Sequence, residues 1–299
     1  MSAPIPVLMV HWNQPDLCIT SAKSFLQQDC QCRVVIVDNA SCAEAYCRLQ
    51  ESLRQYSGIE VVRLESNMGF AGALAFAVSR ILPDCRAPVV IFAAHDATAR
   101  PGAVQRLIDA VYSDDNVGIA FSRSEIAYIG SWHPILGPRW RRVPESELQS
   151  YEVLYGTWFP GHCLAVRREV LDQGIGMDAQ LFTYHEEVDM CLHVRRVGLN
   201  SVLATRAFVD NTSWSGTTIQ TRLIPYLFAR NSVIISRKYR GETASWFRGA
   251  YVMLGAFKGL PASWGRAPQF SAIARIRGAI DALRGRYGMP PEDIFKIYT

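Results

Sequence analysis

The sequence of 299 residues lacks the features that mark several classes of protein. It has no stretch of about 20 uncharged apolar residues, so we expect no transmembrane helix. None of the eight cysteines forms a CxxC pair and no Cys/His spacing fits a zinc site. Most of the cysteines look like small buried hydrophobic residues, which favours a reducing compartment. The N-terminus has no basic segment before its short apolar run, so it predicts a first strand rather than a signal peptide. We therefore expect a globular, cytoplasmic protein.

The net charge of +4 is modest, but it is distributed unevenly. Basic residues far outnumber acidic ones between Arg222 and Arg286, in a segment that also contains aromatic residues. Such a segment suits an anionic membrane surface, which would make the protein peripheral on the inner face of the cytoplasmic membrane. The alternatives are that the segment packs against the rest of the protein, forms an oligomer contact or binds nucleic acid. The segment has no recognisable nucleic-acid-binding motif, so we expect no nucleic-acid partner.

Short apolar segments rich in β-branched residues alternate with segments of helical character. The predicted strands are Val7–Val10, Val34–Asp38, Val61–Leu64, Val89–Phe92 and Val117–Phe121. The predicted helices between them are Pro15–Gln28, Ala43–Tyr56, Ala71–Leu82 and Pro101–Tyr112. The alternation predicts an α/β fold with right-handed βαβ units and a mostly parallel central sheet flanked by helices.

The pattern changes after the fifth predicted strand. Residues 122–155 are rich in Trp, Pro and Arg, and they predict an irregular excursion that returns to the sheet near Trp158–Val166. Three helices are predicted after Thr221, over Ile224–Tyr239, Ser245–Leu260 and Ile273–Tyr287. We therefore predict one domain over residues 1–220, with halves that meet near residue 120, and a helical C-terminal extension over residues 221–299.

Polar or glycine-rich sequence follows four consecutive predicted strands. These segments are His11–Asn13, Asp38–Ser41, Glu65–Gly72 and Ala93–Thr98. Ligands of α/β sheets bind at the carboxyl ends of the strands, where such segments meet. Loops are commonly polar, but an acid at the end of a strand occurs twice, at Asp38 and Asp96.

Each of these segments has a chemical and a structural interpretation. Asp38 suits hydrogen bonds from a nucleobase or ribose, and it equally suits a helix cap. The small residues of Asn67–Gly72 favour phosphate at a helix start, although they match neither the dinucleotide fingerprint nor a Walker A loop. Asp96 suits a divalent cation that bridges phosphates, or a turn before a helix.

The segment Leu181–Arg196 places three carboxylates within four residues, at Glu186, Glu187 and Asp189. They stand at the start of a predicted helix, where the helix dipole favours negative charge. That is a suitable place for a general base or a metal-facing acid. A solvated acidic first turn is the structural alternative.

Taken in order, six segments from about Val7 to Tyr239 resemble the family 2 inverting glycosyltransferases, particularly their bacterial rhamnosyltransferase-like branch. The segments are VLMVHWNQPDL, VVIVDNAS, NMGFAGALAFAV, FAAHDATARPGAV, GHCLAVRREVL and LFTYHEEVDMCLHVRRVG. The resemblance implies a GT-A fold and transfer of a hexosyl unit, with rhamnosyl as one candidate, from a nucleotide-diphosphate sugar. The acceptor would be a cell-surface glycan such as lipopolysaccharide, or a polyprenyl-linked precursor. The alternative is a non-catalytic homologue that binds sugar nucleotides or glycans.

The resemblance also implies roles for individual residues. The residues expected to contact the donor are Asp38, Asn39, Asn67, Gly69 and Asp96. Asp96 would also bind Mg²⁺ or Mn²⁺. Glu187 would be the catalytic base, with Glu186 as the second candidate and Asp189 in the same motif. Substrate contacts are predicted for Trp158, His162, His185 and Arg195, with core packing as the alternative for Trp158.

Three departures from the family pattern leave points open. Only Asp96 remains of the family's Asp-x-Asp motif, and Glu187 replaces the usual Asp. No His occurs in residues 208–215, where the family commonly has a second metal ligand, so Asp210 or Asn211 is the candidate substitute. Metal dependence, the identity of the base and the oligomeric state, a homodimer included, stay open.

Overall fold

The computed structural model describes residues 3–211, 223–259 and 271–295. Its centre is a nine-stranded sheet in the order β3-β2-β1-β4-β10-β6-β11-β5, with β9 paired to β11. The first four strands along the chain are parallel neighbours: β1 (Ile5–His11), β2 (Cys32–Asp38), β3 (Ile59–Arg63) and β4 (Val89–Ala94). The strand order reverses between β1 and β4, and in α/β sheets ligands bind at such a point.

The other half of the sheet is mixed. Strand β10 (Cys163–Arg167) runs antiparallel between β4 and β6 (Val117–Arg123), and β6 is parallel to β11 (Asn200–Asn211). Strands β5 (Ala97–Ala99) and β9 (Val153–Gly156) pair antiparallel with different parts of β11. The α/β class and the five predicted strands, which are β1 to β4 and β6, are confirmed.

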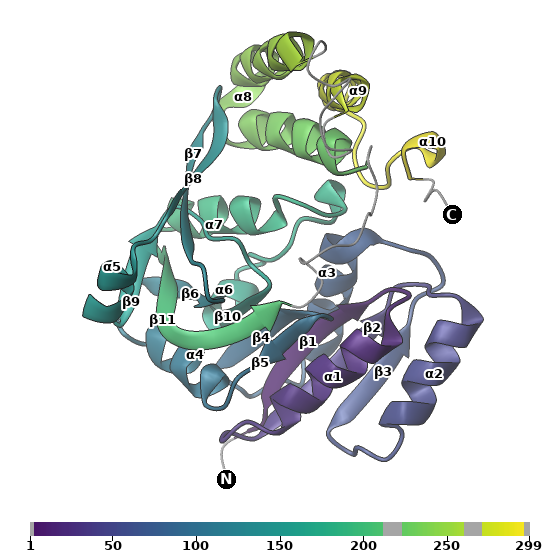
Figure 1. Ribbon diagram of the computed structural model, residues 1–299, viewed down its shortest axis with the longest axis vertical. Helices are drawn as coiled ribbons and strands as arrows, with labels where there is room; N and C mark the ends of the chain where they lie inside the picture. Colours follow the sequence, from purple (N-terminus) through teal and green to yellow (C-terminus); the bar gives the residue numbers. More distant parts are fainter. Residues whose placement is uncertain (1–2, 212–222, 260–270, 296–299) are drawn as a thin grey trace.

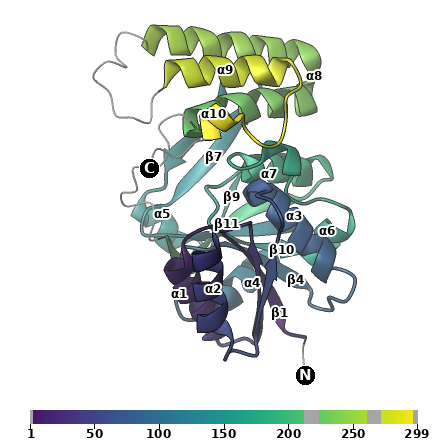
Figure 2. The same ribbon diagram turned by 90° about the vertical axis from the view of Figure 1, so that its right-hand side faces the viewer.

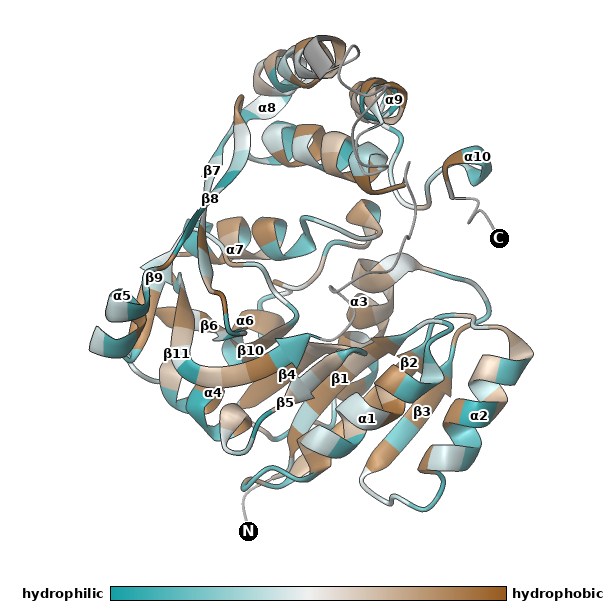
Figure 3. Cartoon of the chain, in the orientation of Figure 1, coloured by the Kyte–Doolittle hydropathy of each residue, from teal (hydrophilic) through white to brown (hydrophobic). Residues whose placement is uncertain are grey.

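Helices cover both faces of the parallel half. Helices α1 and α2 lie on one face and α3 lies on the other (Figures 1 and 2). The bounds are α1 (Pro15–Leu26), α2 (Ala43–Leu53), α3 (Gly69–Ile81), α4 (Ala103–Val111) and α6 (Arg168–Asp172). Colouring by hydropathy shows apolar strands between these layers (Figure 3), and every residue of β1 is buried.

The predicted irregular excursion is wrong in part, because residues 122–155 contain regular structure. Strands β7 (Tyr128–His133) and β8 (Gly137–Arg142) form a separate antiparallel hairpin, followed by α5 (Glu145–Ser150). Strand β8 reads GPRWRR and four of its six residues are exposed, so it has no apolar alternation that would predict a strand. The long strand β11 was not predicted either.

The carboxylate helix α7 (Glu186–Arg196) lies between the sheet and the C-terminal helices (Figures 1 and 2). Helix α8 (Leu223–Gly259) breaks at Gly241, where φ is 83°. Its two halves confirm the prediction of two separate helices in this part of the chain. Helix α9 (Ala272–Leu283) packs along α8, and the short elements η1 (Ala179–Leu181) and α10 (Glu292–Phe295) complete the fold.

Among the described residues, no helix is long and apolar enough to cross a membrane. The predicted boundary at residue 220 lies outside the described residues and stays a prediction.

One close contact joins the parallel half of the sheet to the segment before α7. Gly69, the first residue of α3, has a φ of 73°, and a Cβ there would lie 2.2 Å from the Phe182 carbonyl oxygen. The Ala71 backbone N–H donates to the same oxygen over 3.0 Å. Only glycine allows this approach, so the start of α3 fixes the position of the segment that leads into α7.

We expect Gly69→Ala to lower the free energy of unfolding by about 2–4 kcal/mol, because alanine is strained at this φ and its Cβ would overlap the Phe182 carbonyl. Gly174→Ala is the matched control, since Gly174 has a φ of +75° with no atom within 4 Å of an added Cβ. It should cost only about 1 kcal/mol. Urea unfolding measures both variants, and equal losses would contradict the proposed contact.

Candidate active site

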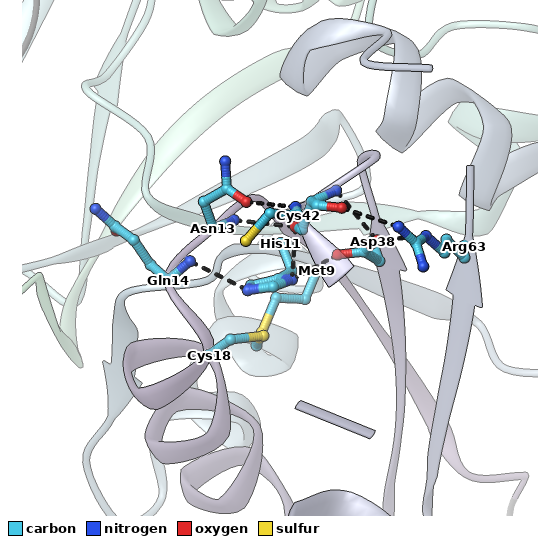
Figure 4. Close-up of polar contacts among 9 residues, drawn as sticks. Met9, His11, Asn13, Gln14, Cys18, Asp38, Cys42 and Arg63 are labelled. Carbon is cyan, nitrogen blue, oxygen red and sulfur yellow. Dashed lines mark hydrogen bonds and ion pairs between the residues drawn. The ribbon is translucent and has the colours of Figure 1, made fainter. Parts of the chain in front are cut away.

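A buried histidine–carboxylate pair lies at the end of the first two strands (Figure 4). His11 and Asp38 are register partners, and His11 Nδ1 lies 2.8 Å from Asp38 Oδ1. The Gln14 backbone N–H donates to His11 Nε2, so Nδ1 carries the proton that His11 donates to Asp38. Burial favours the neutral acid, but hydrogen bonds from His11 and Ser41 outweigh it and lower the pKa of Asp38. The pair is therefore a fixed anionic anchor beneath the strand ends.

Arg63, the last residue of β3, places a cation beside this anchor. Its Nη2 donates to the Ser41 carbonyl over 2.9 Å, and its Nε lies 3.6 Å from Asp38 Oδ2. The guanidinium stacks 4.3 Å above the Tyr46 ring, and 40% of the side chain is exposed. A partly exposed, oriented guanidinium suits an anionic ligand. The sequence analysis missed Arg63, although it stands within the predicted strand Val61–Leu64.

The loops after β2 and β3 are joined by the side chains of two asparagines. Asn39 Nδ2 donates to Asn67 Oδ1 over 2.9 Å and to the Gly69 carbonyl over 3.2 Å. Asn39 Oδ1 accepts from the Met68 backbone N–H, and Asn67 Oδ1 accepts from the Gly69 N–H. The structure thus brings together Asn39, Asn67 and Gly69, beside Asp38.

Asp96 lies in the tight turn between β4 and β5, and only 6% of it is exposed. His162 is near it: burial lowers the pKa of His162, while its bond to the Val209 carbonyl and the charges of Asp96 and Asp210 oppose that shift. The predicted residues Asp96 and His162 therefore face the same region. His95, next to Asp96, instead bonds to Gln14 Oε1 over 2.7 Å.

The two candidate substitutes for the missing histidine differ in their surroundings. Asp210 is engaged by Arg100, whose Nε and Nη2 each lie 2.8 Å from one of its carboxylate oxygens. Asn211 is the register partner of Ala97, directly after Asp96. The rest of residues 208–215, from Thr212, lies outside the described residues. Asp210 is therefore already paired with a cation, whereas Asn211 lies next to the strand that follows Asp96.

The described residues contain no group of three or more His, Cys, Asp or Glu side chains that could hold a metal ion. Mg²⁺ is usually bound through one or two carboxylates and completes its shell with waters and substrate phosphates. A single carboxylate at Asp96 fits that mode, in which the cation is shared with a diphosphate, and does not fit an all-protein cage.

The three carboxylates of α7 have different environments. Burial and the neighbouring charge of Glu187 raise the pKa of Glu186 well above its usual range, and Glu186 Oε2 has no hydrogen-bond partner among the described residues. Burial raises the pKa of Glu187 to about 7, against the effect of backbone N–H groups at Glu187 and Val188. Burial also raises the pKa of Asp189, although Lys238 Nζ lies 2.8 Å from its Oδ2. A pKa of about 7 suits Glu187 to exchange a proton near neutral pH.

The remaining predicted substrate residues lie in three different places. His185 is buried against Phe228, at 4.7 Å between ring centroids, and burial lowers its pKa to about 3, so its ring is neutral. Trp158 is buried and donates from Nε1 to the Ser131 carbonyl of the hairpin, as core packing requires. Arg195 is exposed in the last turn of α7, about 12 Å along the axis from Glu187. Their substrate contacts stay predictions.

Comparisons with known proteins show which proteins the chain resembles. A relative from Mycobacterium tuberculosis, N-acetylglucosaminyl-diphospho-decaprenol L-rhamnosyltransferase, is 26% identical over 237 residues, which cover 70% of this chain and 76% of the relative.

Two solved structures share the fold. Mannosyltransferase PcManGT from Pyrobaculum calidifontis, in complex with GDP-Man and Mn²⁺, has a TM-score of 0.59 at 14% identity, covering 96% of this chain and 88% of that one. Residues 1–349 of S. aureus TarS, in complex with UDP-GlcNAc, have a TM-score of 0.58 at 12% identity, covering 94% and 82%. The predicted GT-A fold is thereby confirmed. The sequence pattern described as glycosyl transferase family 2 matches residues 7–175, more than half of the chain, and the chain therefore belongs to glycosyltransferase family 2.

Proposed function

We propose that the protein is an inverting glycosyltransferase that moves a hexosyl unit from a nucleotide-diphosphate sugar to a cell-surface glycan or a polyprenyl-linked acceptor. The observation that carries this proposal is Glu187, a carboxylate with a pKa raised to about 7 at the start of α7. The contact between Gly69 and Phe182 ties that helix start to the donor-side loops. A rhamnosyl donor and a lipid-linked acceptor are supported by the name of the M. tuberculosis relative.

The two adjacent glutamates have different proposed roles in the reaction. The acceptor hydroxyl attacks the anomeric carbon while Glu187 takes its proton, the bond to the nucleoside diphosphate breaks, and the configuration inverts. Burial and the charge of Glu187 raise the pKa of Glu186 well above its usual range, so Glu186 holds its proton more tightly than an ordinary glutamate. The raised pKa opposes a second negative charge beside the base.

The donor side would bind the nucleotide and stabilise the leaving group. Arg63 presents a partly exposed guanidinium, and Asp38, Asn39 and Asn67 hold the loops that surround it. Asp96 is the residue that would hold Mg²⁺ or Mn²⁺, with Asn211 beside it. When bound, the cation supplies positive charge to the departing diphosphate.

The second half of α8 supports the proposed membrane surface. Its exposed large apolar residues are Trp246, Phe247, Tyr251, Leu254 and Phe257. At 100° per residue they share one helix face, opposite the buried Ser245, Val252 and Ala256. An exposed apolar face of this extent marks an interaction surface. Because the proposed acceptor is linked to a lipid, we infer that this face binds an anionic bilayer. The protein would then be peripheral on the inner face of the cytoplasmic membrane.

The donor proposal is tested by thermal shift with nucleoside diphosphates. We expect one of them to raise the melting temperature, and Mn²⁺ or Mg²⁺ to add to the rise, because ligands that bind only the folded state stabilise it. Asp96→Asn should lose the part of the temperature rise that depends on the cation and keep the part that the nucleoside diphosphate gives alone. Asp84→Asn, at an exposed acid, is the matched control. If no nucleoside diphosphate stabilised the protein with either cation, the proposed donor class would be wrong.

The role of the base is tested with two matched substitutions. Glu187→Gln should lower transfer by about 100-fold or more, whereas Glu186→Gln should retain activity within a few-fold, because the raised pKa of Glu186 favours the neutral form, which glutamine resembles. Wild-type activity should rise with pH through about 7. A larger loss in Glu186→Gln would assign the base to Glu186, and an inactive wild type that binds donor would favour the non-catalytic homologue.

The same pKa shift makes a stability prediction. A folded-state pKa of about 7 against 4.5 in the unfolded chain means that the folded protein binds the proton more tightly. Stability therefore falls as pH rises from 4.5 to about 7. Glu187→Gln removes this loss, so thermal unfolding should show the variant to be more stable than wild type at pH 8, by about 3 kcal/mol, with no gain at pH 4.

Membrane contact is tested by sedimentation with phosphatidylglycerol vesicles. The double variant Phe247→Ser and Leu254→Ser should bind at least ~10-fold more weakly, because two large apolar side chains no longer enter the bilayer. Tyr151→Ser, which is also 58% exposed but lies before β9, should bind as wild type does. Equal binding by all the proteins would place any membrane contact elsewhere.

A further inference from the structure

We propose that Asn231, on α8, positions the catalytic carboxylates by holding the backbone of Leu181–His185 in a strained conformation. The inference rests on the proposed role of Glu187. It concerns a residue that the sequence analysis did not single out and that lies in the C-terminal helices rather than in the sheet.

The segment that leads into α7 has an unusual backbone. Phe182, Tyr184 and His185 have φ angles of 66°, 68° and 69°, and none of them is glycine. Such residues are strained in this region and persist only where their surroundings hold them. His185 is also the residue whose carbonyl accepts the Asp189 N–H, the first hydrogen bond of α7. The strained segment therefore decides where the helix begins.

One side-chain amide holds three carbonyls of this segment. Asn231 Nδ2 lies 2.9 Å from the Leu181 oxygen, 2.9 Å from the Thr183 oxygen and 2.7 Å from the Tyr184 oxygen. Asn231 Oδ1 accepts from Arg230 Nε over 3.0 Å, which fixes the orientation of the amide. With the amide reversed, its oxygen would face three carbonyl oxygens.

Arg230 strengthens the same attachment. Its Nη2 donates to the Leu181 carbonyl over 2.9 Å, and its Nη1 donates to the Gly288 carbonyl over 2.7 Å. Two turns further along α8, Lys238 bonds to Asp189 Oδ2 and the Tyr239 hydroxyl donates to the Asp189 carbonyl. Helix α8 therefore holds α7 at the segment before it and again in its first turn.

This attachment bears on the chemistry, because backbone N–H groups of Glu187 and Val188 oppose the burial that raises the pKa of Glu187. If Tyr184 and His185 relaxed to right-handed helical angles, α7 would start earlier and those N–H groups would enter the helical hydrogen-bond ladder. Glu187 would then lose its place opposite the acceptor hydroxyl. Asn231 is fully buried, so it acts through the segment and is a positioning residue.

The test compares Asn231→Ala and Asn231→Asp with Ser236→Ala. Ser236 is equally buried on α8. Its replacement by alanine removes two hydrogen bonds, to the Ser232 and Pro134 carbonyls, that do not involve Leu181–His185. We expect both Asn231 variants to lower kcat for sugar transfer by about 10- to 100-fold, while KM for the donor changes less than ~2-fold. Ser236→Ala should keep kcat within ~2-fold of wild type, because it leaves the hydrogen bonds to Leu181–His185 unchanged.

Amide hydrogen exchange is the second readout, measured well below the melting temperature of each protein. In wild type, the N–H groups of Phe182, Thr183 and Asp189, which have backbone acceptors, should be protected, and in both Asn231 variants they should exchange faster. Protection in the sheet should not change.

These readouts separate the two proposals. A wild type without transfer activity would contradict the proposed function, while exchange would still test the attachment. Unchanged kcat and exchange in a folded Asn231 variant would overturn the inference, as would an equal kcat loss in Ser236→Ala. If neither Asn231 variant folds, rapid exchange of these N–H groups in wild type would overturn it, and slow exchange there would support it.

Discussion

The structure depends on the backbone of Leu181–His185, which is held from two sides. On the sheet side, the Phe182 carbonyl accepts from the Ala71 N–H and lies against Gly69. On the helical side, Asn231 bonds to three carbonyls of the same segment. Neither half of the molecule could place α7 alone, because each supplies only part of the hydrogen bonding that a strained backbone requires. The start of α3 and the C-terminal helices thereby meet at the residues that precede the carboxylates.

Burial then gives similar side chains different chemistry. Asp38, Glu186 and Glu187 are all acids at the ends of secondary structure, but their partners differ. His11 and Ser41 lower the pKa of Asp38, so it is a fixed charge. Burial and the charge of Glu187 raise the pKa of Glu186 well above its usual range, and burial raises the pKa of Glu187 to about 7. The environments therefore separate a fixed negative charge from two carboxyl groups that hold their protons more tightly.

Much of the fold was predictable from local pattern, whereas the organisation of the site was not. Apolar β-branched runs identified β1 to β4 and β6, since buried parallel strands carry that composition. The same rule missed β8, which is mostly exposed. The gathering of Asn39, Asn67 and Gly69 followed from strand ends that share an edge. The attachment by Asn231 joins residues about 50 positions apart, and no periodicity or motif signals it.

The central claim is that this arrangement holds Glu187 with a pKa near 7 beside Glu186, whose pKa is raised well above its usual range. Carbon-13 NMR titration of the glutamate side-chain carboxyl carbons measures it directly. One resonance should titrate near pH 7 and vanish in Glu187→Gln, and a second, lost in Glu186→Gln, should titrate well above the usual glutamate range. Titration of every glutamate near the usual 4.5 would contradict the account.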